Sequence, residues 1–208
     1  MAQSEIARAI NDEFDRSGIV VSDTVVNRLS EYWRLLAHWN RSINLTSFDL
    51  RPSNAKAIVR LLVEPVSAAR FLRATPAVSF DFGSGGGSPA IPIRIVNPSQ
   101  TLVLVESRER KAAFLSEAAR ELGLAGVVVE NARIDEVASR PGSSGRADLV
   151  TVRAVRLSPS EYSNIHRVLR FDGQALLLGP STTAEVAHRG LEKDMDFNGG
   201  VILRKSGV

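Results

Sequence analysis

The sequence predicts an α/β protein in which a doubly wound, mostly parallel sheet follows an N-terminal helical cap. From residue 78 onward, short apolar runs alternate with runs of helical period, which is the pattern of parallel strands joined by crossover helices. Before residue 75 only helical periods occur. We therefore expect a helical cap region, 1–74, and a sheet domain, 75–208, that form one compact unit.

The composition is that of an ordinary globular protein, with 208 residues of which 44% are hydrophobic and 24% charged. No apolar run is long enough to span a membrane and no signal-peptide pattern is present, so we expect a cytoplasmic protein. The absence of cysteine excludes disulfides, thiolate metal sites and cysteine nucleophiles. No metal-ligand spacing occurs. The net charge of +3 permits a nucleic-acid partner without requiring one.

The cap should contain three helices. Apolar residues recur at helical spacing over 3–17 and again over 23–40, and each run has one apolar face that needs a partner surface. A third helical run covers 55–72. It contains Pro65, which should end or kink the helix because proline lacks an N–H and its ring clashes with the preceding turn.

The stretch from 78 to 92 predicts a buried strand, a tight loop and the start of a helix. Asp81 lies near the end of the apolar run, and Gly83, Gly85 and Gly87 follow at every second position. This spacing differs from the G-x-G-x-x-G of dinucleotide-binding folds. An acidic residue before such a loop is typical of methyltransferases that bind S-adenosylmethionine against bare backbone. We assign Asp81, Gly83 and Gly85 to this cofactor; the alternative is a flexible linker or a structural turn.

A second apolar run, 101–105, ends in Glu106. Continuous apolar runs are typical of strands buried on both faces of a parallel sheet. Glu106 follows Gly83 by 23 residues. This is close to the roughly 20 at which an acidic residue meets a nucleotide ribose in strand-loop-helix-strand units. We assign Glu106 to the ribose hydroxyls. The alternative is a carboxylate that caps the start of the next helix.

Two further strands complete the predicted centre of the sheet. One ends at Glu130, and the turn after it lies where an adenine would sit. The other, 148–152, is followed by Arg153 and Arg156. Arginines are costly to bury unpaired, and ligands of open α/β sheets bind at the carboxyl ends of strands. We therefore favour a site role for Arg153.

The last part of the chain gives weaker signals. A helix should run to about residue 170, after which Asp172-Gly173 should turn the chain into a fifth strand, 174–178. Residues 182–195 can form a helix, and 201–203 form a short last strand.

Several stretches, in order and at family-like spacing over most of the chain, resemble the GidB/RsmG family. The family transfers a methyl group from S-adenosylmethionine to N7 of a guanosine in 16S small-subunit rRNA. The resemblance implies a class I S-adenosylmethionine-dependent methyltransferase (Rossmann-like) fold and a monomer that acts on small-subunit rRNA or a pre-assembled subunit, with no membrane partner. The resembling stretches are 39–40, 43–46, 81–92, 104–107, 111–115, 131–135 and 152–155.

Carried over by position, the resemblance adds or repeats cofactor contacts at Gly83, Ser88, Ile134, Asp135 and Arg153. Guanine N7 already has an in-plane lone pair, so no general base is expected, and catalysis would be positioning plus electrostatics. Arg153 and Arg156 are the catalytic candidates, because either guanidinium could steady the guanine or a phosphate.

Two alternatives remain. The family's histidine-to-aspartate-serine motif is replaced by Leu61-Leu62-Val63-Glu64-Pro65, and its lysine-glycine after strand five by Leu178-Gly179-Pro180. A divergent relative would bind S-adenosylmethionine but methylate another substrate. A non-catalytic module would bind the cofactor and dock on RNA or a protein. A broad basic surface around the cofactor site favours rRNA, and a closed apolar pocket favours a small substrate.

Overall fold

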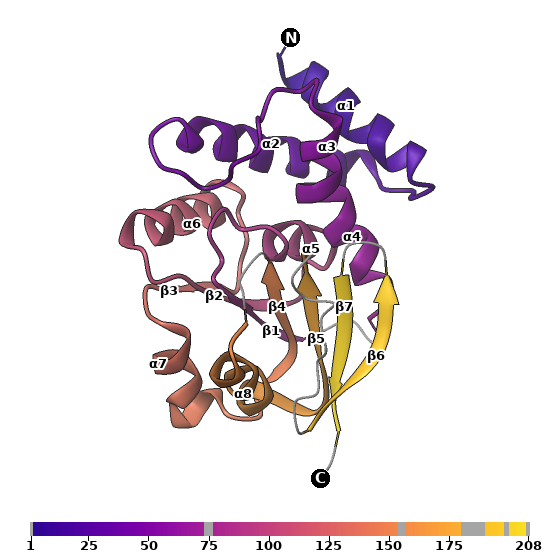
Figure 1. Ribbon diagram of the computed structural model, residues 1–208. Coiled ribbons are helices and arrows are strands. Elements are labelled where there is room, and N and C mark those ends of the chain that lie inside the picture. Colours follow the sequence, from indigo (N-terminus) through magenta and orange to yellow (C-terminus); the bar gives the residue numbers. More distant parts are fainter. Residues whose placement is uncertain (1, 73–76, 154–156, 180–189, 198–199, 207–208) are drawn as a thin grey trace.

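The computed structural model describes residues 2–72, 77–153, 157–179, 190–197 and 200–206. A seven-stranded sheet has the order β3-β2-β1-β4-β5-β7-β6 (Figure 1). The strands are β1 (Val78–Phe82), β2 (Thr101–Val105), β3 (Val127–Glu130), β4 (Ala147–Arg153), β5 (Leu169–Leu178), β6 (Leu191–Phe197) and β7 (Gly200–Lys205). Strands β1 to β5 pair in parallel, whereas β7 is antiparallel to both β5 and β6. The predicted doubly wound, mostly parallel sheet is confirmed.

Helices cover both faces of this sheet. The cap helices are α1 (Ala2–Arg16), α2 (Asp23–Asn40), α3 (Ala55–Ile58), the π-helical η1 (Val59–Val63) and α4 (Glu64–Ala69). The crossover helices are α5 (Ala90–Val96), α6 (Glu109–Glu121), α7 (Ile134–Ser139), the 3₁₀ turn η2 (Pro141–Ser143) and α8 (Pro159–Val168). In Figure 1, strands β4 and β5 point towards the cap helices, so the cap lies at the carboxyl ends of the parallel strands.

Alternate residues of the strands feed two cores. Leu102 and Leu104 of β2 join one hydrophobic cluster with α5, α6 and the cap, whereas Val103 and Val105 join a second cluster with α7 and α8. This is the period-two alternation of a strand buried on both faces. The first cluster contains residues of both predicted regions, and the boundary predicted between residues 74 and 75 falls within 73–76, outside the described residues.

The third cap helix does not end at Pro65. Instead, the chain turns from α3 into the π-helical η1 and then into α4, which contains Pro65 in its first turn. A π turn is a known way to insert an irregularity without breaking a helix. Pro65 offers no N–H to the carbonyl of Leu61 four residues earlier, and the Ser88 hydroxyl donates to that carbonyl at 2.8 Å.

Asp172 and Gly173 do not turn the chain into a new strand, which contradicts our prediction. They lie inside β5, where the pairing with β4 shifts register between Ala147 and Leu149, and Asp172 has a φ of 63°. The turn signal therefore produces an irregularity of the strand, because the ladder resumes at Gln174 opposite Leu149.

The predicted helix over 182–195 is wrong in its last part, since residues from Leu191 onward form β6; residues 180–189 lie outside the described residues. β6 is an edge strand rich in charged residues, which commonly protect sheet edges from pairing with other chains. These charges also obscure the alternation of apolar and polar residues that would identify a strand in the sequence. The single last strand that we expected is thus an antiparallel pair, β6 and β7. Among the described helices, none combines the length and the apolar character needed to cross a bilayer.

Candidate functional site: two joined cavities at the strand ends

Two cavities lie at the carboxyl ends of β1, β2 and β4 and share Gly83 and Glu106 in their walls. The first has a volume of about 520 Å³ and lies between the glycine loop, 83–88, and the cap loop, 44–48. The second has a volume of about 560 Å³ and lies beside the turn 132–135 and the start of α8. Both are of the size that small ligands and cofactors occupy.

The backbone of the glycine loop is fixed at the end of β2. The N–H groups of Gly83 and Ser84 donate to the carbonyl of Val105 at 3.0 and 3.1 Å. Gly83, Gly85 and Gly87 have positive φ angles of 70°, 52° and 89°. A Cβ at Gly87 would lie 2.5 Å from Cδ1 of Ile91, so the start of α5 also needs a glycine here.

Glu106 is held between the loop and α6. Its Oε2 accepts a hydrogen bond from the Gly85 N–H at 2.9 Å, and its Oε1 accepts one from the Arg108 N–H at 2.8 Å. The second bond is the helix-start contact that we gave as the alternative role. Both bonds orient the carboxylate at the junction of the two cavities, where its remaining lone pairs can accept hydrogen bonds from a ligand.

Asp81 lies beneath the glycine loop. It is 1% exposed, and the Thr151 hydroxyl of the neighbouring β4 donates to its carboxylate. The Ser84 hydroxyl donates to the Asp81 carbonyl at 3.0 Å. Burial raises the pKa of the Asp81 carboxyl to about 6, although the Thr151 and Ser84 bonds oppose this shift. Asp81 is not among the described lining residues of either cavity, so its place is in the support of the loop.

Arg153 ends β4 and forms part of the wall of the first cavity. Its side chain is 13% exposed, and its Nη1 donates to Oε2 of Glu64 at 2.9 Å. Glu64 also accepts from Nη1 of Arg60 at 2.6 Å. Burial lowers the pKa of Arg153, and the Glu64 carboxylate opposes this shift. Within the described structure, Nε and Nη2 of Arg153 are buried without a hydrogen-bond partner, which leaves two donors for a ligand.

The cap adds two residues that we did not predict for the site. The buried Tyr32 of α2 donates its hydroxyl to the Gly86 carbonyl at 2.6 Å, and burial raises the pKa of this phenol. Oδ1 of Asn40 accepts from the N–H groups of Leu45 and Thr46 at 2.9 and 3.0 Å, which fixes the cap loop 44–48 in the cavity wall. Asn40 belongs to a resembling stretch, whereas no sequence signal pointed to Tyr32.

The structure brings most of the predicted site residues together. Gly83, Gly85, Ser88, Glu106 and Arg153 line the first cavity. Ile134 and Asp135 line the second with Gly83 and Glu106, and Asp135 is also 3.5 Å from Nε of Arg133. Arg156 lies outside the described residues. In the described part of the chain, no group of His, Asp or Glu has the arrangement of a metal site.

Comparison with known proteins identifies relatives over most of the chain. A family model, GidB, described as rRNA small subunit methyltransferase G, matches residues 25–202. Ribosomal RNA small subunit methyltransferase G from Neisseria gonorrhoeae is 38% identical over 134 residues, which are 64% of this chain and 60% of that protein. The protein of the same name from Rubrobacter xylanophilus is 34% identical over 174 residues, or 82% of this chain and 64% of that protein.

Solved structures of low sequence identity support the fold. A putative S-adenosyl-L-methionine-dependent methyltransferase from Methanococcus maripaludis has a TM-score of 0.59 at 10% identity and covers 85% of this chain and 92% of its own. An S-adenosylmethionine-dependent O-methyltransferase from Thermotoga maritima has a TM-score of 0.54 at 16% identity, over 70% of this chain and 66% of its own.

The fold is therefore that of class I S-adenosylmethionine-dependent methyltransferases, with a helical cap added at the N-terminus. The chain covers about 60% of the length of the first curated relatives that it matches. Because the family model matches residues 25–202, from the second cap helix to the last strand, this chain belongs to the GidB family.

Proposed function

We propose that this chain is an S-adenosylmethionine-dependent methyltransferase that methylates N7 of a guanosine in 16S small-subunit rRNA. The main supporting observation is the pair of cavities that join at Gly83 and Glu106, in a chain of the GidB family. The second cavity has the position of a nucleoside site, and the first cavity reaches Arg153 and the cap loop 44–48.

The residues present fit S-adenosylmethionine, whose bound form supplies an electrophilic methyl group on a sulfonium. The Glu106 carboxylate can accept hydrogen bonds from ribose hydroxyls, and the turn at Ile134 and Asp135 can border the base. The two unpartnered donor nitrogens of Arg153, Nε and Nη2, suit a carboxylate or another anionic acceptor. Gly83, Gly85 and Ser88 would border the ligand along the loop.

For the reaction, this chain has to hold the guanine in place and needs no group to remove a proton. The cap loop and the glycine loop enclose the first cavity from two sides, which positions an entering base and limits its freedom. Arg153, with Arg156 close behind in the sequence, can steady the guanine or a phosphate. Arg108 and Lys111 at the same cavity add positive charge that attracts an RNA backbone.

We propose further that the protein works as a monomer in the cytoplasm, on free small-subunit rRNA or on a pre-assembled subunit. The test starts with small-subunit rRNA from cells with and without the gene, in which 7-methylguanosine is mapped by reductive strand cleavage. Loss of one site in the deletion should be restored by the wild-type gene and not by a Gly83→Asp copy. Unchanged methylation, with the purified protein still binding S-adenosylmethionine, would mean that the substrate is another one.

The cofactor assignment has its own test. Glu106→Ala should weaken S-adenosylmethionine binding by about 1–3 kcal/mol, because charge-assisted hydrogen bonds are lost. Glu130→Ala is the matched control, since Glu130 ends the neighbouring strand β3 and pairs with Arg140 outside the cavities. Equal calorimetric affinity of the two variants would rule out the ribose role of Glu106.

A further inference from the structure

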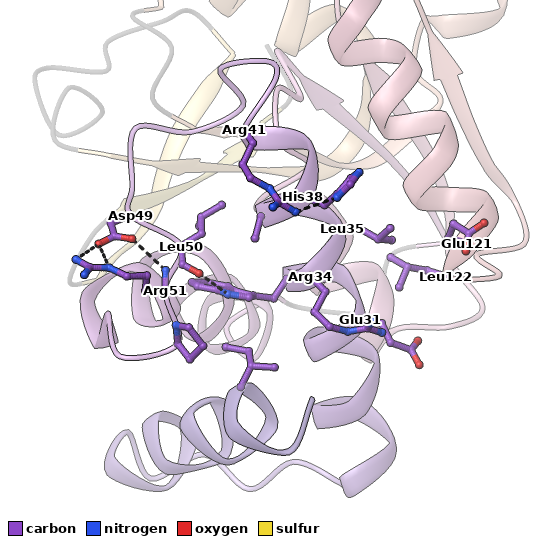
Figure 2. A pocket seen from close by; sticks show the side chains of 14 residues that line it. Glu31, Arg34, Leu35, His38, Arg41, Asp49, Leu50, Arg51, Glu121 and Leu122 are labelled. Carbon is purple, nitrogen blue, oxygen red and sulfur yellow. Dashed lines mark hydrogen bonds and ion pairs between the residues drawn. The ribbon is translucent and has the colours of Figure 1, made fainter. Parts of the chain in front are cut away.

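A row of basic side chains lies outside the two cavities, on α2. Arg34, His38 and Arg41 follow each other at intervals of four and three residues, so they share one face of the helix, and all three are exposed. Figure 2 shows them along a groove of about 830 Å³ that is also bordered by residues 49–52 and the end of α6. The Arg41 guanidinium donates to Nδ1 of His38 at 3.0 Å.

The row continues to the first cavity. Nη2 of Arg110, on α6, donates to the Ser42 carbonyl at 3.3 Å, next to Arg41 in the chain. Arg108 and Lys111, on either side of Arg110 in the sequence, line the first cavity. We call Arg34, His38, Arg41 and Arg110 the basic face. It joins the groove on α2 to the cavity that should hold the target base.

The three arginines of the basic face form no ion pair with the acids of the groove in the described part of the chain. The groove contains three acids, of which Asp49 pairs with Arg51 and Glu121 with Arg120 (Figure 2 shows the first pair). The third, Glu31, forms no ion pair among the described residues, and neither do Arg34, Arg41 and Arg110.

Three cations, Arg108, Arg110 and Lys111, lie at the N-terminus of α6, where positive charge opposes the helix dipole. The acids Glu106 and Glu109 lie at the same helix start, so both signs of charge are present there. The seven steps from Arg34 on α2 to Arg41 at its C-cap rise by about 10 Å, a length over which one strand at duplex spacing presents about three phosphates.

We propose that the basic face binds the phosphate backbone of the RNA next to the target nucleotide; this inference rests on the proposed function. A base in the first cavity leaves its flanking backbone at the cavity mouth. From there the positive charges lead over Ser42 onto α2. This continuity favours RNA over an acidic protein surface, which would have no reason to follow the cavity edge.

The test compares three variants with the wild-type protein. Arg34→Ala/Arg41→Ala/Arg110→Ala removes three charges from the basic face. Arg140→Ala/Arg167→Ala/Lys193→Ala removes three exposed charges, at the C-cap of α7, in α8 and in β6; these three side chains do not border either cavity. The third variant, Arg34→Lys/Arg41→Lys/Arg110→Lys, keeps the three positive charges. None of these residues lines the cavities, so S-adenosylmethionine affinity should stay unchanged in all.

The probe is transcribed 16S rRNA, and its affinity is measured between 50 and 200 mM salt. The alanine variant of the basic face should bind about tenfold more weakly or worse, and its salt dependence should be flatter by about 0.7–0.9 per lost phosphate contact. The control and the lysine variant should stay close to the wild-type protein. In methylation assays, the alanine variant should show a raised KM for RNA with little change in kcat.

The outcomes separate the two proposals. If the wild-type protein methylates neither transcribed rRNA nor assembled small subunits, the proposed function fails. If the wild-type protein methylates rRNA and both alanine variants bind it equally, the basic face is not the RNA surface. The same conclusion follows if the basic-face variant binds naked rRNA normally and loses only its binding to assembled subunits, because the face then contacts a protein.

Discussion

The first cavity has two walls of different construction. The wall from the sheet is held by hydrogen bonds between adjacent elements. The glycine loop donates to the carbonyl at the end of the adjacent strand β2, and Glu106 accepts from the N–H of Arg108, two residues later. The wall from the cap uses long-range hydrogen bonds: the Tyr32 hydroxyl donates to the Gly86 carbonyl, and the Arg153 guanidinium donates to Glu64. The sheet thus sets the path of the loop, whereas the cap sets the direction of a buried guanidinium. If this is correct, substitutions in the cap should change the affinity for the ligand.

The largest effect should come from the cap wall. Glu64→Ala would leave Arg153 buried without its partner, and breaking a buried ion pair costs about 3–5 kcal/mol of unfolding free energy. Urea denaturation measures this loss, and calorimetry should show weaker S-adenosylmethionine binding because the guanidinium is no longer aimed. Glu117→Ala, which breaks an exposed pair with Arg120, is the control. An equally small loss of unfolding free energy in both variants would show that the Glu64–Arg153 pair does not stabilise the fold.

The sheet wall should show a pH dependence of similar size. Burial raises the pKa of Asp81 from 3.8 to about 6, so the folded protein holds this proton more tightly than the unfolded chain. Stability therefore falls as pH rises from about 4 through 6, by about 3 kcal/mol, and the cost is fully present above that range.

Asp81→Asn removes this titration and keeps an acceptor for Thr151. Denaturation curves between pH 4 and 7 should show the wild-type protein losing stability relative to the variant. Parallel pH profiles for the two proteins would contradict the raised pKa of the buried Asp81 carboxyl.

The glycine loop itself should be somewhat less sensitive. Gly87→Ala places a Cβ against the buried Ile91 at a φ of 89°, which should cost about 2–3 kcal/mol through overpacking and backbone strain. Gly142→Ala is the control, because its Cβ would meet no atom within 4 Å. Thermal unfolding of both variants measures the difference, and an unchanged midpoint for Gly87→Ala would show that the loop and Ile91 adjust to the added Cβ without cost.

The smallest effect should be that of Tyr32→Phe, which removes one hydrogen bond to Gly86 and costs about 1 kcal/mol. Cofactor affinity is the sharper readout. A loss of affinity at nearly unchanged stability would make Tyr32 a positioning residue of the loop. A loss of stability alone would reduce the cap to a packing partner.

Local sequence patterns predicted the sheet wall well. The predicted ends of β1, β2 and β4 were correct to within a residue or two. In each case the apolar run and the glycine, carboxylate or arginine that marks its end are adjacent in the sequence. The cap wall escaped prediction for a physical reason. Tyr32 meets Gly86 across 54 residues, and Glu64 meets Arg153 across 89, and no periodicity within a helix encodes such partners.

The wrong predictions share another cause, which is that local signals were overridden by pairing. The turn signal of Asp172-Gly173 is accommodated by a register shift in β5. The edge strand β6 has few apolar residues, so its sequence resembles a helix surface until β7 pairs with it. These elements depend on partners more than on propensity.

The sheet order also bears on how the chain matures during synthesis. β1 lies between β2 and β4, and the pairing of Asp81 with Thr151 spans 70 residues. A nascent chain that has emerged only as far as β3 can therefore close one edge of β1, with its acidic side chain still lacking the Thr151 hydroxyl. Because domains fold as units while translation proceeds from the N-terminus, the ligand pocket forms late, and a ribosome stalled before β4 would display a cap without a working pocket.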